Sequence, residues 1–310
     1  MKKLDFHVHI YEGISIDESV RNFNDMCERF GYEGVGIMAL CHNSKGYHES
    51  CNEQALELKS KMPGSYAFAS LHIDRPSFVE QAEDIMSRGF DGIKLLNGKP
   101  SEYRHFGFGY EDPKFYEFFE YAEKYQIPLM IHNNDPEYSW DINRVSKSAL
   151  AKGWYYDEKM PSQKFFFDVL DDVFATFPNL RAAIAHLGFY TESIQQLEKA
   201  DKMLETYKNL SFDITPALNI YAELSKIPEQ AQAFFTKNHE RLIFGTDAIN
   251  DLTGYPREYN NIKNAVTDAF IQGKSRDSEV ARSRNTACLD LTAEMMENIY
   301  YNNALRFIKR

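Results

Sequence analysis

Short apolar runs alternate with amphipathic, helix-length segments from one end of the chain to the other. The runs that predict strands are Leu4–Ile10, Gly34–Leu40, Tyr66–Leu71, Phe90–Leu96, Ile127–Ile131, Ala182–His186, Leu210–Ile214 and Leu242–Thr246. The amphipathic stretches lie near residues 15–30, 50–61, 76–88, 113–125, 162–176, 191–205, 227–238 and 256–272. Eight strands that alternate with helices predict a closed parallel (β/α)8 TIM barrel, with a doubly wound open sheet as the alternative.

The connections refine this picture. Asp112-Pro113 reads as a helix N-cap followed by proline at the first helical position. Two long segments, Asn97–Asp112 and Asn133–Pro161, follow the fourth and fifth strands, at the barrel face where active sites are built. No Gly/Ser-rich linker divides the chain, so we expect residues 1–310 to form a single domain.

Composition excludes several classes of protein. The 310 residues are 43% hydrophobic and 14% aromatic, which is sufficient for a large core. A net charge of −11 argues against nucleic acids and anionic membranes as partners, because both attract basic surfaces. No apolar stretch approaches the roughly 20 residues of a membrane span, and Asp5 and two histidines interrupt any signal-peptide core. The four cysteines form no CxxC pair or disulfide framework, so we expect reduced thiols in a cytoplasmic protein.

The first predicted strand carries Asp5-Phe6-His7-Val8-His9. Residues two apart on a strand project to the same face, so His7 and His9 point together and present two imidazoles to one ion. Two histidines that face solvent would give the same pattern. The HxH pair alone therefore does not establish a metal site.

Other strand ends carry similar groups. The fifth predicted strand ends at His132, the sixth at His186, and Asp247 follows the eighth. A single histidine at such a position is more often a core residue than a ligand. The joint pattern favours a site, because imidazole nitrogen and carboxylate oxygen are the donors that Zn²⁺ and related ions prefer.

With these residues in place, the chain resembles the amidohydrolase superfamily, specifically its amidohydrolase-related (amidohydrolase 2) branch of TIM-barrel hydrolases and decarboxylases. The resemblance rests on the HxH strand, Gly92-Ile93-Lys94-Leu95, Ile131-His132, Pro178-Asn179-Leu180 with Ala185-His186-Leu187-Gly188, Phe244-Gly245-Thr246-Asp247, and a C-terminal helix beginning near Ile299. These pieces span nearly the whole chain in the expected order.

The resemblance implies a role for each matching position. His7, His9, His132 and Asp247 would hold one metal ion, expected to be zinc, with manganese compatible with the same ligands. His186 would orient or deprotonate a water whose pKa the cation lowers. Asp247 would also act as a general acid or base.

Lys94 leaves three interpretations open. Some superfamily members carry a carbamylated lysine on the fourth strand that bridges two metals. An unmodified Lys94 would instead pair with Asp247 or bind an acidic substrate. We favour the unmodified lysine and one ion, because the branch resembles the mononuclear type; carbamylation would mean two ions.

Four further residues are candidates around the site. His42 and His72 follow the second and third strands, and Trp154 lies in the second long segment; each would contact substrate. Asp213, on the seventh strand, would hydrogen-bond a ligand histidine and fix its tautomer.

These residues support three functions. The first is hydrolysis, by a metal-activated water, of a small carboxylated lactone, amide or ester. The second is metal-dependent non-oxidative decarboxylation of an unsaturated or aromatic acid, and the third is a non-catalytic barrel with structural zinc. Hydrolysis is favoured because the HxH segment lacks the proline that follows it in many decarboxylases of the branch. The resemblance also allows a homodimer, and the sequence names no substrate.

Overall fold

The computed structural model describes residues 1–11, 13–43, 46–47, 50–216, 219–251, 254–273, 279 and 285–309, without the side chains of positions 42, 43, 46, 47, 219 and 255. None of the helices in this described part is long and apolar enough to span a membrane.

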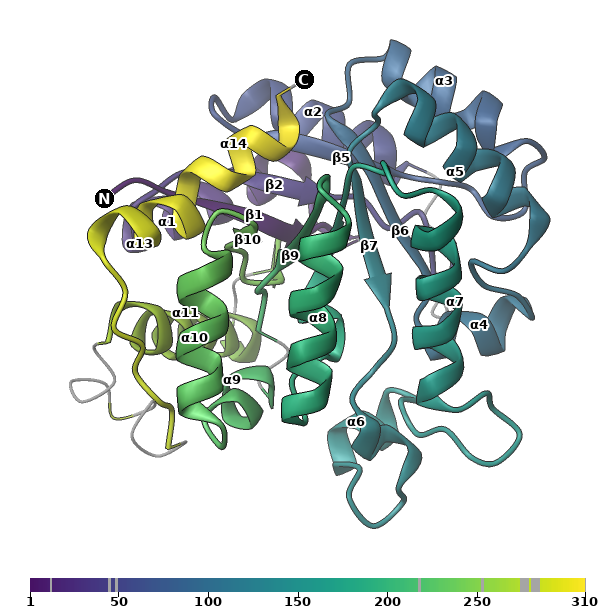
Figure 1. The fold of residues 1–310 in the computed structure, drawn as a ribbon. Coiled ribbons are helices and arrows are strands. Elements are labelled where there is room, and N and C mark those ends of the chain that lie inside the picture. The colour runs from purple at the N-terminus through teal and green to yellow at the C-terminus, as the bar shows by residue number, and fades with distance from the viewer. Residues whose placement is uncertain are drawn as a thin grey trace.

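One parallel sheet forms the centre of the fold (Figure 1). Its strands are β1 (Lys3–His9), β2 (Tyr32–Met38), β5 (Tyr66–Ser70), β6 (Gly92–Gly98), β7 (Leu129–Asn133), β8 (Ala182–Ile184), β9 (Leu210–Asp213), β10 (Leu242–Ile243) and β11 (Ala248–Ile249). Neighbours follow chain order from β1 to β10, with β2 beside β5. The eight predicted strands are therefore confirmed, the last as two short pieces.

The two pieces of the last strand close the barrel. β10 pairs with β9. β11, which is separated from β10 by the four residues 244–247, pairs with β1. Between them, Phe6 N donates to Phe244 O at 3.1 Å and Asp247 N donates to His7 O at 2.7 Å. The closed (β/α)8 barrel is thus confirmed over the open sheet.

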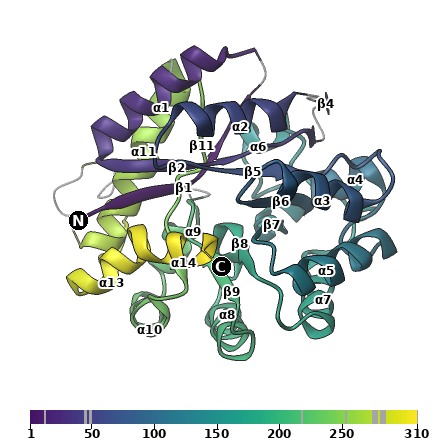
Figure 2. The ribbon, with the colours of Figure 1, turned by 90° about the horizontal axis from the view of Figure 1, so that it is seen from above.

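Helices surround the strands on the outside (Figure 2). They are α1 (Ile16–Phe30), α2 (Cys51–Lys61), α3 (Phe78–Ser87), α5 (Pro113–Tyr125), α7 (Gln163–Thr176), α8 (Ile194–Thr206), α10 (Pro228–Asn238) and α11 (Gly254–Gln272). As predicted, Asp112 caps α5, accepting a hydrogen bond from Lys114 N at 2.9 Å, and Pro113 begins the helix.

Smaller elements occupy the connections. The segment after β6 contains α4 (Pro100–Phe106), and the segment after β7 contains the 3-10 helix η1 (Glu137–Trp140) and α6 (Lys147–Ala151). Others are the hairpin β3 (His42–Asn43) and β4 (Gly46–Tyr47), the turn η2 (Ala185–Phe189) and α9 (Asn219–Leu224). The expected C-terminal helix comprises α13 (Ala293–Glu297), the π-helical η3 (Asn298–Asn302) and α14 (Asn303–Ile308).

Apolar side chains form two layers. The larger lies between strands and helices, and the smaller fills the barrel, where Phe6, Phe68 and Met130 meet Ala304 and Phe307 of α14. The Phe307 ring lies 5.9 Å from that of Phe6 and 6.5 Å from that of Phe68. Helix α14 therefore closes the end where the strands begin and leaves the opposite end for a site.

The expectation of reduced thiols is wrong for two cysteines. Cys41, after β2, and Cys51, at the start of α2, form a disulfide with their Cα atoms 5.2 Å apart. The β3–β4 hairpin returns the chain to α2, which brings the two together although ten positions separate them. These cysteines therefore give no support to a reducing compartment.

Candidate metal centre

A change of face in β1 directs both histidines of the HxH pair into the barrel. Leu4 and Phe6 belong to the interior cluster, so strict alternation would turn His7 outward with the other odd positions. The register against β2 shifts between Asp5 and Val8, and beyond this irregularity Val8 packs in the outer layer. Such a shift re-aims side chains and leaves His7 and His9 facing inward.

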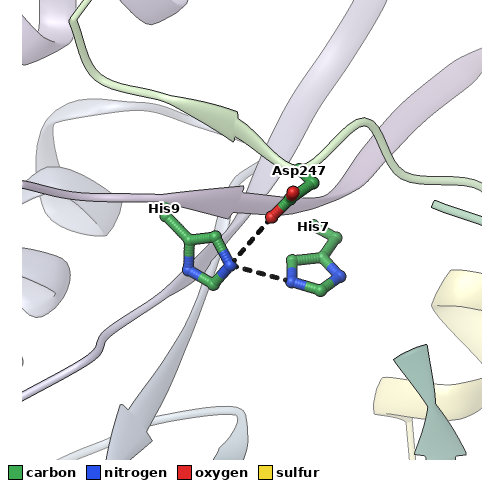
Figure 3. A group of neighbouring side chains, drawn as sticks. All are labelled: His7, His9 and Asp247. Atoms are coloured by element: carbon green, nitrogen blue, oxygen red, sulfur yellow. Dashed lines mark hydrogen bonds and ion pairs between the residues drawn. The ribbon is translucent and has the colours of Figure 1, made fainter. Parts of the chain in front are cut away.

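Asp247 completes a cluster of three, at the carboxyl end of β1 and between the two pieces of the last strand, β10 and β11 (Figure 3). Its backbone is left-handed, with φ of 56°, a conformation that non-glycine residues rarely adopt and that concentrates at functional sites. Its Oδ1 lies 3.1 Å from His9 Nε2, which in turn lies 3.0 Å from His7 Nε2.

Hydrogen bonds at the far side of each ring set the tautomers. His7 Nδ1 donates to the Asp213 carboxylate, and His9 Nδ1 donates to Met38 O at 3.1 Å. Both Nε2 atoms therefore carry lone pairs that face the centre of the cluster. Burial, together with the charge of Lys94, holds the pKa of His7 well below its usual value, which keeps the ring neutral.

This donor set fits a divalent cation. Two lone pairs facing each other at 3.0 Å, with a carboxylate oxygen 3.1 Å from one of them, repel unless a positive charge lies between them. Bonds of about 2.0–2.1 Å at tetrahedral angles place neighbouring donors roughly 3.3 Å apart, close to the observed spacing. Two neutral imidazoles and one carboxylate are also the donor types that zinc takes.

A second layer of residues supports His7. Thr215 donates to Asp213 Oδ1 from its backbone N–H at 2.7 Å, and its Oγ1 lies 3.3 Å from His7 Nδ1. Burial raises the pKa of Asp213 to about 6. A Cβ on Gly245 would lie 2.6 Å from His7 Cβ and 2.7 Å from Thr215 Oγ1, so only glycine fits beside this ring.

His186 lies next to the cluster, at the end of β8. It opens a run of four left-handed residues, 186–189, with φ between 51° and 60°. Its ring centroid lies 5.8 Å from that of His7, and its Nδ1 donates to Thr215 O at 3.0 Å. The other nitrogen, Nε2, is thereby a base. Burial lowers the pKa of His186, so the neutral form is favoured.

His132 lies near His186 but is not part of the cluster of three. The centroids of the two rings are 5.0 Å apart. His132 Nε2 donates to Asn134 O at 3.1 Å and lies 3.9 Å from Asp135 Oδ1. Its role as a ligand stays a prediction, and in this orientation the available nitrogen is Nδ1.

Lys94 is buried beside the cluster. Its Nζ lies 3.3 Å from His7 Nε2, so its nearest polar contact is the histidine and not Asp247. Burial lowers the pKa of Lys94 to about 8. An ammonium group at this position would attract an anionic substrate towards the centre.

Lys263, which was not among the predicted site residues, approaches Asp247 from α11. Its Nζ donates to Asp247 O at 2.6 Å and lies 3.4 Å from Oδ2. Burial alone would raise the pKa of Asp247, but the charge of Lys263 and the contact with His9 hold it well below its usual value. The carboxylate therefore stays ionised.

A second unpredicted network follows β6 and β7. Lys99 Nζ donates to Asp135 Oδ1, and Tyr156 OH donates to Oδ2, each at 2.5 Å. Lys99 Nζ also lies 4.7 Å from the Trp154 ring centroid. After burial, the charge of Lys99 is the largest influence that lowers the pKa of His132, whereas the contact with Asp135 raises it, so the two charges partly offset each other.

The remaining predicted residues lie elsewhere or outside the described part. His72 is buried and lines a cavity of about 920 Å³ with residues of α2 and α3, including Asn52 and Gln81. His42 lies in β3, but its side chain is among those that the structure does not describe. Substrate contact by either residue stays a prediction.

Comparison with known proteins agrees with this architecture. The sequence model of the family described as Amidohydrolase matches residues 5–310. No curated protein gave a significant match.

Solved structures with this fold include enzymes of two reaction types. A probable 2-pyrone-4,6-dicarboxylic acid hydrolase from Acinetobacter baumannii, with citric acid bound, has a TM-score of 0.60 and 13% identity, covering 99% of both chains. A 2,6-dihydroxybenzoate decarboxylase from Rhizobium has a TM-score of 0.58 and 13% identity, covering 99% of this chain and 98% of that one. An uncharacterised TIM-barrel protein from Bordetella bronchiseptica has a TM-score of 0.58 and 14% identity, with the same coverage. At these identities the likeness shows the fold alone.

Proposed function

The chain belongs to the amidohydrolase family, and from this premise we propose that it is a metal-dependent hydrolase of a small carboxylated lactone, amide or ester. The observation that carries the proposal is the convergence of His7, His9 and Asp247 within 4.8 Å, with both imidazole lone pairs turned inward. These three residues would hold one divalent cation, zinc or manganese, with His132 as a fourth ligand.

The bound cation would polarise the substrate carbonyl and lower the pKa of a water molecule. His186 Nε2, whose ring is fixed through Thr215 O, would accept a proton as that water attacks. Asp247, kept ionised by Lys263, would take the second proton of that water from the new hydroxyl group on the carbonyl carbon and pass it to the leaving group. The substrate carbonyl carbon gains one oxygen from water and loses its bond to the leaving atom.

The lysines beside the candidate metal centre support the proposal of an anionic substrate. Lys94 lies beside His7, and Lys99 lies further along the same strand end against Trp154. In our proposal Lys94 binds a carboxylate group of the substrate, which orients the scissile bond towards His186, while Lys99 stays paired with Asp135. Lys94 acts unmodified in this scheme, which therefore needs one ion.

The same side chains support a second function, non-oxidative decarboxylation. A carboxylate held at Lys94 would leave as carbon dioxide as its C–C bond breaks, and His186 or Asp247 would pass a proton taken from water to the carbon left behind. The decarboxylase fold cited above makes this alternative worth testing.

Metal content and product analysis test both functions. Purified protein should contain about one zinc or manganese per chain, and His9→Ala should lose metal and turnover together. His239→Ala, a histidine bonded to Asn298 outside the site, is the matched control and should keep both. Across a panel of lactones and aromatic acids in ¹⁸O-labelled water, hydrolysis places label in product and decarboxylation releases carbon dioxide. Metal-free protein with full activity would exclude both schemes.

A further inference from the structure

A cavity of about 570 Å³ lies at the barrel end opposite the candidate metal centre. Its walls come from residues that precede or begin strands β7 to β10, and from α14. Five of its lining side chains are cationic, namely Arg181, Lys208, Arg241, Arg306 and Lys309. Glu240 is the one carboxylate in the lining.

This concentration of positive charge stands out in a chain of net charge −11. Elsewhere on the surface some lysines pair with carboxylates, as Lys237 does with Asp201 and Glu205, and others such as Lys202 stand apart from one another. Within the described part of the chain, Lys208, Arg241, Arg306 and Lys309 form no ion pair. Glu240 is the one carboxylate in the lining, so it offsets only part of the repulsion between these cations.

Two of the arginines are held in place by backbone carbonyl groups. Arg181 donates to Arg306 O at 3.0 Å, and Arg241 donates to Tyr207 O at 2.7 Å through a single terminal nitrogen. A guanidinium has five N–H donors in a fixed plane, so a hydrogen bond from one of its nitrogens fixes the directions of the remaining N–H groups. Burial lowers the pKa of Arg241, as expected for a cation with no anionic partner beside it.

We propose that this cavity binds a small, multiply charged phosphate compound at a site separate from the metal centre. Arginine and lysine together suit phosphate, because guanidinium forks bind its oxygens in pairs and ammonium adds point charge. Ser211 also lines the cavity with a hydroxyl group, whereas the amide N–H groups of Asn209 and Asn303 already donate to other groups of the protein. The volume lies within the range of small-molecule sites, about 300–1,000 Å³. This inference does not depend on the proposed catalytic function.

Binding to the full-length protein, measured by calorimetry at constant ionic strength, tests the proposal. The probes are inorganic phosphate, pyrophosphate, adenosine monophosphate and citrate, which separate a free phosphate, a diphosphate, a phosphate ester and a polycarboxylate. Lys208→Glu/Lys309→Glu reverses two exposed charges of the cavity, and its one cost elsewhere in the described structure is the hydrogen bond from Lys208 Nζ to Glu205 O at 2.6 Å. Because charged hydrogen bonds are the stronger ones, the Kd for the tightest phosphate probe should rise about tenfold or more. Lys159→Glu/Lys202→Glu makes the same charge change at exposed positions outside the cavity and should leave this Kd unchanged.

A crossed comparison separates this site from the metal centre, where phosphate could also bind. His9→Ala should keep phosphate binding, and Lys208→Glu/Lys309→Glu should keep metal content. Loss of binding in His9→Ala alone would place the anion at the metal centre and overturn the proposal. Equal weakening by the control pair, or citrate binding as tightly as pyrophosphate, would show general charge attraction only and would also overturn it.

Discussion

Asp247 shows how much of the site depends on one side chain from a distant helix. Histidines and an aspartate at strand ends could be predicted, because barrel topology gathers such positions at one face. Lys263 could not, since a lysine in an amphipathic helix normally faces solvent. Its contact with Asp247 exists only because α11 packs against the end of the last strand.

Replacing Lys263 by methionine tests this contact. Without the ammonium, the pKa of Asp247 should rise from its depressed value, so acidification should release metal at a higher pH than in the wild type. Loss of such an outer partner typically lowers metal affinity about 10–100-fold. Metal titration between pH 4 and 8 measures both effects, with the exposed Lys202→Met as control. An unchanged release curve would mean that Lys263 serves packing alone.

Regular elements were predicted better than the connections between them. All eight predicted strands and all eight amphipathic helices are present, because burial against two layers leaves a clear apolar period in the sequence. The β3–β4 hairpin and the Cys41–Cys51 disulfide were missed. Both depend on how the polar connection after β2 folds back onto α2. The spacing of apolar residues within that connection does not indicate this folding.

Thiol reactivity tests the disulfide and the environment of α1. In native protein without reductant, exposed Cys288 should react first with an alkylating reagent. Burial raises the pKa of Cys27 to about 12, so its thiolate is scarce at pH 8 and this residue should react far more slowly. Mass spectrometry after reduction and denaturation should find four alkylated cysteines, against two without reductant. Four without reductant would show that Cys41 and Cys51 are thiols.

At the scale of the molecule, the seam between β1 and the last strand depends on a buried carboxylate. Asp5 accepts hydrogen bonds from Thr246 N at 2.9 Å and from Thr246 Oγ1 at 2.5 Å, across 241 positions of sequence. Burial raises the pKa of Asp5 to about 7. Asp5 stands next to the HxH pair in the sequence, but its position there does not indicate that it joins β1 to the last strand by hydrogen bonds with Thr246.

Thr246→Val keeps the shape of the side chain and removes its hydroxyl donor. Because Asp5 is then left with a buried, unsatisfied oxygen, the free energy of unfolding should fall by about 1–3 kcal/mol. Urea denaturation measures the change. Thr206→Val, which removes an exposed hydroxyl bonded to Lys202 O, is the control and should cost much less. Equal losses in the two variants would show that the seam does not depend on this bond.

The same seam sets an order of events during synthesis. His7 and His9 leave the ribosome long before Asp247, which follows only after strands β2 to β10 have been made. The two histidines therefore meet their carboxylate partner only after the intervening strands of the barrel have emerged. Before Asp247 is made, the nascent chain could hold an ion only weakly, through the two histidines. Metal binding therefore becomes a late step that coincides with the closure of the barrel between β1 and β11.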